Sequence, residues 1–173
     1  LALELGGNAP FIVFDDADLG SAVDGAMASK YRNAGQTCVC ANRIYVQSGI
    51  YDSFVERLAE RVKALQVGNG FDEGVQQGPL IEPAALDKVR EHIADAVSKG
   101  GRIVVGGEAL QGQFFQPTLI ADAEDEARGG CDGLADPQDE PGGLLGGGAH
   151  PLDETFRRTD GCHHRCAERF GQL

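Results

Sequence analysis

The chain has 173 residues, 42% of them hydrophobic and 24% charged, which is typical of one globular domain and unlike a disordered or fibrous protein. The formal net charge of −12 argues against nucleic acid or an anionic membrane as a partner, because both attract clustered lysine and arginine. The sequence shows no apolar run long enough to span a membrane, no signal peptide and no disulfide framework among its five cysteines. A protein of the reducing cytoplasm is expected.

Two apolar segments near the start of the chain are expected to be strands. Residues 1–5 have the composition of a buried strand, and residues 11–14 that of a second one, ended by two aspartates. A helix is predicted from residue 19 to about residue 31, with Asp18 as its cap. Small residues recur along that helix at helical spacing, so it can pack closely against a neighbour.

A cysteine-bearing turn follows this helix and precedes a strand predicted over residues 43–47. Residues 33–43 read Asn-Ala-Gly-Gln-Thr-Cys-Val-Cys-Ala-Asn-Arg, which places Cys38 in a glycine-punctuated turn where its thiol can act as a nucleophile. Upstream, Glu4 ends an apolar run and is followed by two glycines that allow another molecule to approach the backbone. Together these segments suggest a thiolate and a base.

The next elements alternate between helix and strand. Amphipathic helices are predicted over residues 51–65 and 83–98, the second with a proline in its first turn. Residues 102–106 are expected to form a short buried strand, and residues 114–117 an edge strand because of Pro117. The alternation predicts an α/β fold with a layered parallel or mixed sheet and flanking helices.

The composition changes abruptly near residue 121. Residues 121–173 contain no Val, Ile, Met or Lys, and they contain runs of two and three glycines. Such a segment cannot build a strand core, so we expect residues 1–120 to be the ordered domain and residues 121–173 an irregular tail of low order. A shift of reading frame near residue 121 is one explanation for the change.

Two motifs resemble the active-site signatures of the aldehyde dehydrogenase superfamily. They are Glu-Leu-Gly-Gly at residues 4–7 and Gly-Gln-Thr-Cys at residues 35–38, the second followed by Arg43. The flanking residues most resemble the succinate-semialdehyde dehydrogenase branch. This resemblance implies that residues 1–120 are part of an aldehyde dehydrogenase-like catalytic domain. It also implies NAD or NADP as cofactor, a small aldehyde as substrate, and a homodimer or homotetramer.

The resemblance also implies roles for individual residues. Cys38 would attack the aldehyde carbon to form a thiohemiacetal and, after hydride loss, a thioester, while Glu4 would activate the water that hydrolyses it. The backbone of Leu5 and Gly6, with Gly7 beside them, would lie against the nicotinamide. Without the motifs, a lone cysteine is more often a small buried apolar residue.

Two further residues are candidates for substrate choice and regulation. By the same resemblance, Arg32 would bind the distal carboxylate of succinate semialdehyde, a task that suits the fork of a guanidinium. Its alternative role is that of a cation at the end of a helix. Cys40 would share a face with Cys38 in a strand-like conformation, which suggests a reversible oxidative lock between them.

Competing functions remain open from the sequence alone. One is an aldehyde dehydrogenase with a neutral or cationic substrate, and another is an inactive thiol- or metal-binding remnant of such an enzyme. The cysteines and histidines of the last segment match no standard zinc spacing, so no metal site is predicted there. They are Cys131, His150, Cys162, His163, His164 and Cys166. The main expectation is oxidation of succinate semialdehyde to succinate in the breakdown of 4-aminobutyrate.

Overall fold

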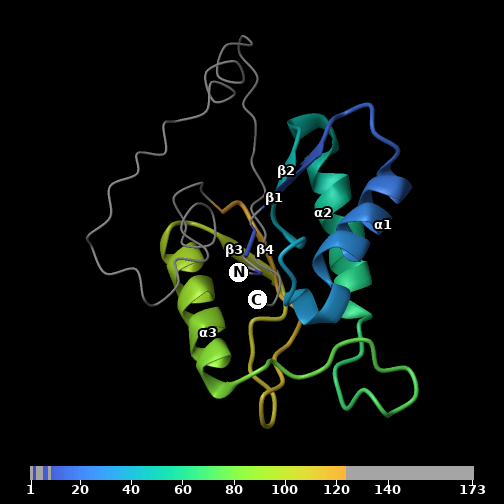
Figure 1. Ribbon diagram of the computed structural model, residues 1–173. Helices are drawn as coiled ribbons and strands as arrows, with labels where there is room; N and C mark the ends of the chain where they lie inside the picture. The colour runs from blue at the N-terminus through green and yellow to red at the C-terminus, as the bar shows by residue number, and fades with distance from the viewer. Residues whose placement is uncertain (1, 3–5, 8, 124–173) are drawn as a thin grey trace.

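The computed structural model describes residues 2, 6, 7 and 9–123. In this part of the chain, helices α1, α2 and α3, a short 3-10 helix η1 and four strands form the fold. Their bounds are β1 Ala9–Val13, α1 Leu19–Lys30, η1 Arg32–Gly35, β2 Ala41–Val46, α2 Ser48–Lys63, α3 Pro83–Ser98, β3 Arg102–Val105 and β4 Leu119–Ala121. Helices α1 and α2 lie on one side of the strands and α3 on the other (Figure 1). The predicted α/β class is confirmed.

The first half of the fold is a parallel strand pair covered by α1 and α2. Strand β1 pairs with β2 in parallel, with Phe11 opposite Ile44, and α1 makes the crossover that parallel strands require. The Asp18 carboxylate accepts a hydrogen bond of 2.8 Å from the Ser21 N–H and so caps α1, as the sequence predicted. Apolar side chains from all four elements, including Phe54, form one core cluster.

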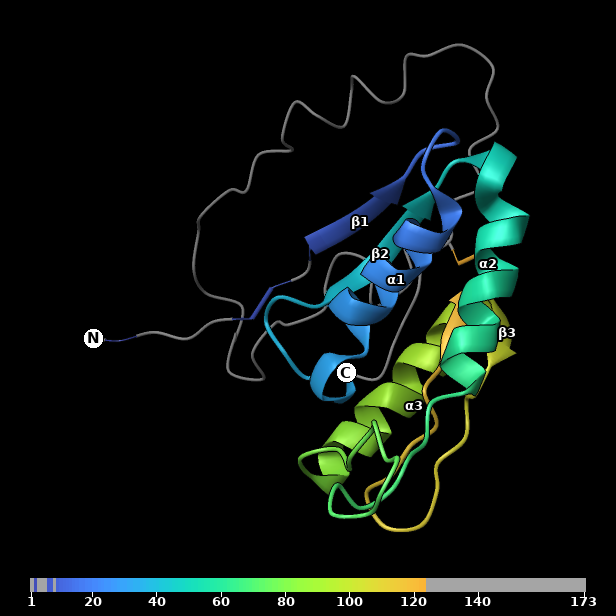
Figure 2. The ribbon, with the colours of Figure 1, turned by 90° about the vertical axis from the view of Figure 1, so that its right-hand side faces the viewer.

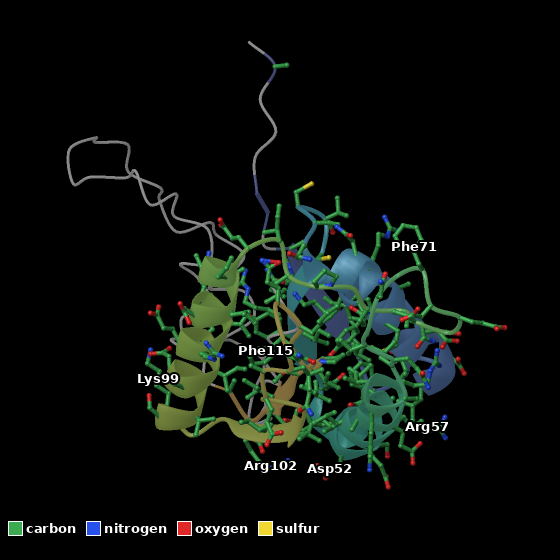
Figure 3. The ribbon with its side chains drawn as sticks, turned by 90° about the horizontal axis from the view of Figure 1, so that it is seen from below. Asp52, Arg57, Phe71, Lys99, Arg102 and Phe115 are labelled. Atoms are coloured by element: carbon green, nitrogen blue, oxygen red, sulfur yellow. The ribbon has the colours of Figure 1, made fainter. Side chains whose placement is uncertain are left out.

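The second half joins α3 to an antiparallel pair, β3 and β4. Helix α3 begins at Pro83 and ends at Ser98, the bounds that the apolar spacing predicted. Its buried face packs against Phe115, which lies inside the fold in Figure 3, whereas Lys99 lies at the outer side of α3. This second core cluster contains Leu80, Leu86, Val89, Ile93, Ala96, Phe115, Ile120 and Ala123.

Strand β4 connects the two cores. All three of its residues are fully buried, and successive side chains of a strand point to opposite faces. Leu119 and Ala121 therefore belong to the core of α1 and α2, while Ile120 belongs to the core of α3. The halves of the described fold are held together by this alternation.

Three sequence expectations about strands need correction. Strand β3 is not buried, since Ile103 is 40% exposed; among the described strands it pairs only with β4, so its other edge is open. Residues 114–117 form no strand beyond an isolated bridge from Phe115 to Ala109. The ladder starts two residues after Pro117, which has no N–H to donate. Strand β2 begins at Ala41 rather than residue 43.

The position of β4 predicts a large difference between two isoleucines that face each other in the ladder. Ile120 is fully buried and pairs with Ile103, which is 40% exposed. We expect Ile120→Ala to lower the free energy of unfolding by about 2–5 kcal/mol, because it leaves a cavity, and Ile103→Ala to lower it by much less. Urea denaturation of both variants measures this, and equal losses would contradict the assignment of β4 to the core.

Several sequence expectations lie outside the described residues. They include the first strand over residues 1–5, most of the tail over residues 121–173, and the cysteines and histidines of that tail. Within residues 9–123, no helix combines the length and apolar character that crossing a membrane requires.

Candidate active site

The cysteine loop, residues 31–41, connects the end of α1 to the start of β2 (Figure 2). Asn33, Ala34 and Gly35 have φ angles of 50°, 53° and 76°, so three successive left-handed residues turn the chain sharply. A hydrogen bond of 3.2 Å from the Cys40 N–H to the Thr37 carbonyl then closes a tight turn. Cys38 lies within this turn, exposed and with a free thiol. The loop therefore presents the thiol to solvent.

Gly7, the last residue of the first motif, lies directly against this turn. A Cβ atom placed on Gly7 would overlap the carbonyl oxygen of Cys38 and lie 3.5 Å from its carbonyl carbon. The close approach of the two backbones thus requires glycine at position 7, and it brings Gly7 beside Cys38, about thirty residues further along the chain. Gly6, beside it, is exposed. Glu4 and Leu5 lie outside the described residues.

Gln36 fastens the cysteine loop to a second segment of the chain. Its side-chain oxygen accepts a hydrogen bond of 3.0 Å from the Ile81 N–H, and its side-chain nitrogen donates one of 3.4 Å to the Pro79 carbonyl. Nearby, the buried Gln77 donates a hydrogen bond of 2.7 Å to the Tyr31 carbonyl. Sequence reasoning treated Gln36 only as part of a motif, and did not identify this support.

The two ends of the cysteine loop meet at a buried polar cluster. Lys30, only 1% exposed, donates a hydrogen bond of 2.6 Å from Nζ to Asn42 Oδ1. The Cys40 thiol donates to the Lys30 carbonyl at 3.6 Å, and the Ala41 N–H donates to Ser29 Oγ at 3.3 Å. Sequence reasoning missed Lys30, because a lysine at the end of a helix is ordinarily a solvated cation.

The charge of Lys30 is costly in this position. Burial lowers the pKa of Lys30 to about 8, against an ordinary value of 10.5, and the nearby Cys40 opposes that shift in part. The unfolded chain therefore binds this proton more tightly than the folded chain does. The cost to the free energy of unfolding is complete below about pH 8. It falls as the pH rises from about 8 to 10.5, and it is absent above 10.5. At neutral pH the Lys30 charge opposes folding.

Arg32 lies just beyond α1, as the first residue of η1, and its side chain is exposed. The cation in the last turn of α1 is Lys30, and Arg32 lies two residues beyond that helix, in the single turn of η1. Among the described residues Arg32 forms no salt bridge. Its guanidinium is thus available to an external carboxylate.

Cys40 differs from the sequence expectation. It lies in the turn rather than in a strand, and it is 1% exposed whereas Cys38 is exposed, so the two thiols do not share a face. The Cys40 sulfur also lies 2.7 Å from Thr37 Oγ1. A bond between the two sulfurs would require the loop to rearrange and break these contacts.

Metal binding has no support within residues 9–123, where no three His, Cys, Asp or Glu side chains group in a way that suits a metal ion. The chemistry available to this loop is that of an exposed thiol, a tightly packed backbone beside it and the exposed guanidinium of Arg32.

Comparison with known proteins identifies relatives of this chain. A model described as the aldehyde dehydrogenase family matches residues 1–132. A glutarate-semialdehyde dehydrogenase of Pseudomonas putida is 61% identical over 127 residues, covering 73% of this chain and 26% of that protein. A succinate-semialdehyde dehydrogenase (NADP+) of Escherichia coli is 62% identical over 130 residues, covering 74% of this chain and 27% of that protein.

A solved structure has the same fold over the same part. The crystal structure of an aldehyde dehydrogenase from Brucella melitensis biovar abortus matches with a TM-score of 0.72 and 63% sequence identity, covering 73% of this chain and 26% of that one. The chain spans about a quarter of the length of the curated relatives it matches.

Proposed function

Because the chain belongs to the aldehyde dehydrogenase family, we propose that the protein carrying it oxidises an aldehyde to a carboxylic acid with NAD or NADP. The proposed substrate is succinate semialdehyde and the product succinate. The observation that carries this proposal is the exposed Cys38 thiol in a tight turn. The carbonyl of Cys38 packs against the Gly7 backbone.

The proposed chemistry uses Cys38 twice. Its thiolate adds to the aldehyde carbon and forms a carbon–sulfur bond, while the electron pair of the broken C=O π bond moves to the oxygen; the product is the alkoxide of a thiohemiacetal. NAD or NADP, held beside Leu5 and Gly6, would supply the acceptor for the hydride that leaves this carbon. Cys38 then holds the acyl group as a thioester, and water attacks the carbonyl while Glu4 takes a proton from that water. The carbon–sulfur bond breaks, and the thiolate is restored as the carboxylic acid leaves.

The residues beside the thiol are compatible with a nicotinamide. Gly6 is exposed and has no side chain, so a flat ring can approach the backbone there. We propose that the backbone of Leu5 and Gly6 forms this contact. The choice between NAD and NADP depends on residues that meet the ribose 2′ position, and both remain in the proposal.

A direct assay tests the proposed function. The protein carrying this chain is incubated with succinate semialdehyde and either nucleotide, and formation of reduced nucleotide and of succinate is followed. Equal amounts of both products are expected. Formation of reduced nucleotide without succinate would contradict the proposal. So would a folded protein that reduces neither nucleotide with any aldehyde.

Glutarate semialdehyde is a second candidate, because a relative with that printed name is 61% identical. The two aldehydes differ by one methylene group, which is worth only about 1–3 kcal/mol in discrimination. Comparing kcat/KM for both on the same protein identifies the preferred chain length.

Arg32 is the residue proposed to bind the distal carboxylate of either substrate. We expect Arg32→Ala to raise KM for succinate semialdehyde by roughly 10–100-fold, the range for losing a charge-assisted hydrogen bond, while KM for neutral butanal changes little. Arg57→Ala is the matched control, since Arg57 lies exposed on α2, at the edge of the molecule in Figure 3. Equal changes for both aldehydes would contradict the assignment.

Cys40 is proposed as the partner of Cys38 in an oxidative lock. Peroxide would oxidise the Cys38 thiolate to a sulfenic acid, and the Cys40 thiol would displace water from it to give a disulfide. We expect peroxide inactivation that dithiothreitol reverses. In Cys40→Ala this disulfide cannot form, so excess peroxide should oxidise the Cys38 sulfenic acid further to the sulfinic acid, and the reversible part should be lost. Full reversal in Cys40→Ala, measured by activity recovery, would contradict the lock.

The intact protein is proposed to be a cytoplasmic homodimer or homotetramer. The observation behind the assembly is exposed apolar surface within the described fold, including Ile12 and Phe14 at 49% each on and beside β1. Light scattering of the purified protein measures its mass, and a monomer would contradict the proposal.

A further inference from the structure

We infer that the buried hydrogen bond between Lys30 and Asn42 is a clamp for the cysteine loop, and that Lys30 is thereby a positioning residue for the Cys38 thiol. This inference rests on the proposed function of Cys38 as nucleophile. The two clamp residues flank the loop: Lys30 is the last residue of α1, directly before it, and Asn42 lies on β2, directly after it.

Hydrogen bonds join the two ends of the cysteine loop. Lys30 and Asn42 are 12 residues apart in the chain, and their side chains meet at 2.6 Å. The Ala41 N–H and the Cys40 thiol add bonds from the end of the loop to Ser29 and to the Lys30 carbonyl. All these contacts join the end of α1 to the entry of β2, so they fix the distance that the cysteine loop has to span.

The identity of residue 30 argues for a role other than stability. An apolar side chain would fill the same interior position without a charge, whereas the Lys30 charge opposes folding, because burial lowers its pKa. A buried ammonium does, however, demand an acceptor in one geometry. Asn42, which is 6% exposed, supplies that acceptor from β2. Such a bond resists displacement of either end of the loop.

The position of the clamp suits control of the thiol. The left-handed residues Asn33, Ala34 and Gly35 make the loop dependent on where its ends are held. Cys38 packs its carbonyl against Gly7, and this contact leaves no room for a Cβ. A small shift of the loop base would therefore move the Cys38 backbone relative to Gly7, and with it the direction of the thiol.

Hydrogen exchange tests the clamp on the full chain without any enzymatic assay. In Lys30→Met, we expect amides of residues 31–41 to exchange roughly ten-fold faster than in the unaltered chain, while those of α3 are unchanged. Lys88→Met, an exposed lysine on α3, is the matched control and should leave both regions unchanged. Unchanged loop exchange in Lys30→Met would overturn the inference, and so would an equal acceleration in α3, because that is general destabilisation.

Two variants of the acceptor keep the test decisive if Lys30→Met does not fold. Asn42→Asp retains an oxygen for Lys30 and should keep the loop protected, whereas Asn42→Leu removes it and should lose about the same protection as Lys30→Met. Equal protection in the two Asn42 variants would overturn the clamp.

A kinetic readout then separates positioning from folding. In the protein carrying this chain, Lys30→Met should lower kcat per titrated Cys38 by roughly ten-fold or more with little change in KM. Unchanged kcat per titrated thiol would overturn the positioning role. If no variant or parent oxidises aldehydes, the proposed function fails, while the exchange experiment still decides on the clamp.

Discussion

Replacing Cys38 with alanine is expected to lower kcat/KM for aldehyde oxidation by roughly 10⁴-fold or more, because the variant has no atom that can form the covalent intermediate. Cys38 is exposed, so its removal leaves no cavity and the fold should be retained. The measurement is steady-state formation of reduced nucleotide, with the fold checked by thermal unfolding. Val39→Ala is the control, since Val39 is the next residue in the turn and is 62% exposed.

The contrast between these neighbours makes the result specific. If Val39→Ala lost as much activity as Cys38→Ala, the turn conformation rather than the thiol would be responsible. If Cys38→Ala retained most of its activity, the proposed mechanism would be wrong, because an alanine side chain cannot form the covalent intermediate. A mass increase at Cys38 upon brief mixing with substrate and nucleotide would report the thioester directly.

Gly7→Ala is expected to reduce kcat by roughly 100-fold, the effect of displacing a reacting group by about 1 Å. The added methyl group would overlap the Cys38 carbonyl oxygen, which is backbone and cannot rotate aside as a side chain can. Either the turn or the first segment has to move. Because Gly7 does not require a left-handed φ, the expected loss is steric.

Gly70→Ala is the matched control for this substitution. A Cβ on Gly70 meets nothing within 4 Å, so this variant should keep the activity of the parent. The rate of Cys38 alkylation by iodoacetamide provides a second measurement, and it should change in Gly7→Ala but not in Gly70→Ala. Parent-like kcat and alkylation in Gly7→Ala would show that the two segments are not packed together as described.

The parts of the fold that could be predicted from sequence are those governed by local rules. Helix α3 begins at Pro83 and buries residues at helical spacing, and both features are visible in the sequence. The turn at Cys38 could equally be predicted, because the sequence shows Gly35 and the Gly-Gln-Thr-Cys motif of residues 35–38. The start of α2 was missed by three residues, since Ser48 and Gly49 read as punctuation but form its first turn.

The parts that could not be predicted depend on neighbours distant in the chain. Strand β4 has only three residues, and its burial on both faces requires α3 on one side and α1 with α2 on the other. Lys30 is buried because Asn42 accepts its hydrogen bond, which no pattern of the α1 residues indicates. The contact of Gly7 with Cys38 became predictable only through the resemblance of two motifs to one family.

The support of Tyr31 by remote residues has a consequence for the order of folding. The Tyr31 hydroxyl donates to the Thr118 carbonyl, 87 residues further along the chain, and its own carbonyl accepts from Gln77. Contacts of such sequence separation form late, because a long loop has to close first. During synthesis, the nucleophile therefore leaves the ribosome long before its supports exist. In stalled nascent chains Cys40, which is 1% exposed in the folded chain, should be readily alkylated until Thr118 has emerged; early protection of Cys40 would contradict this order.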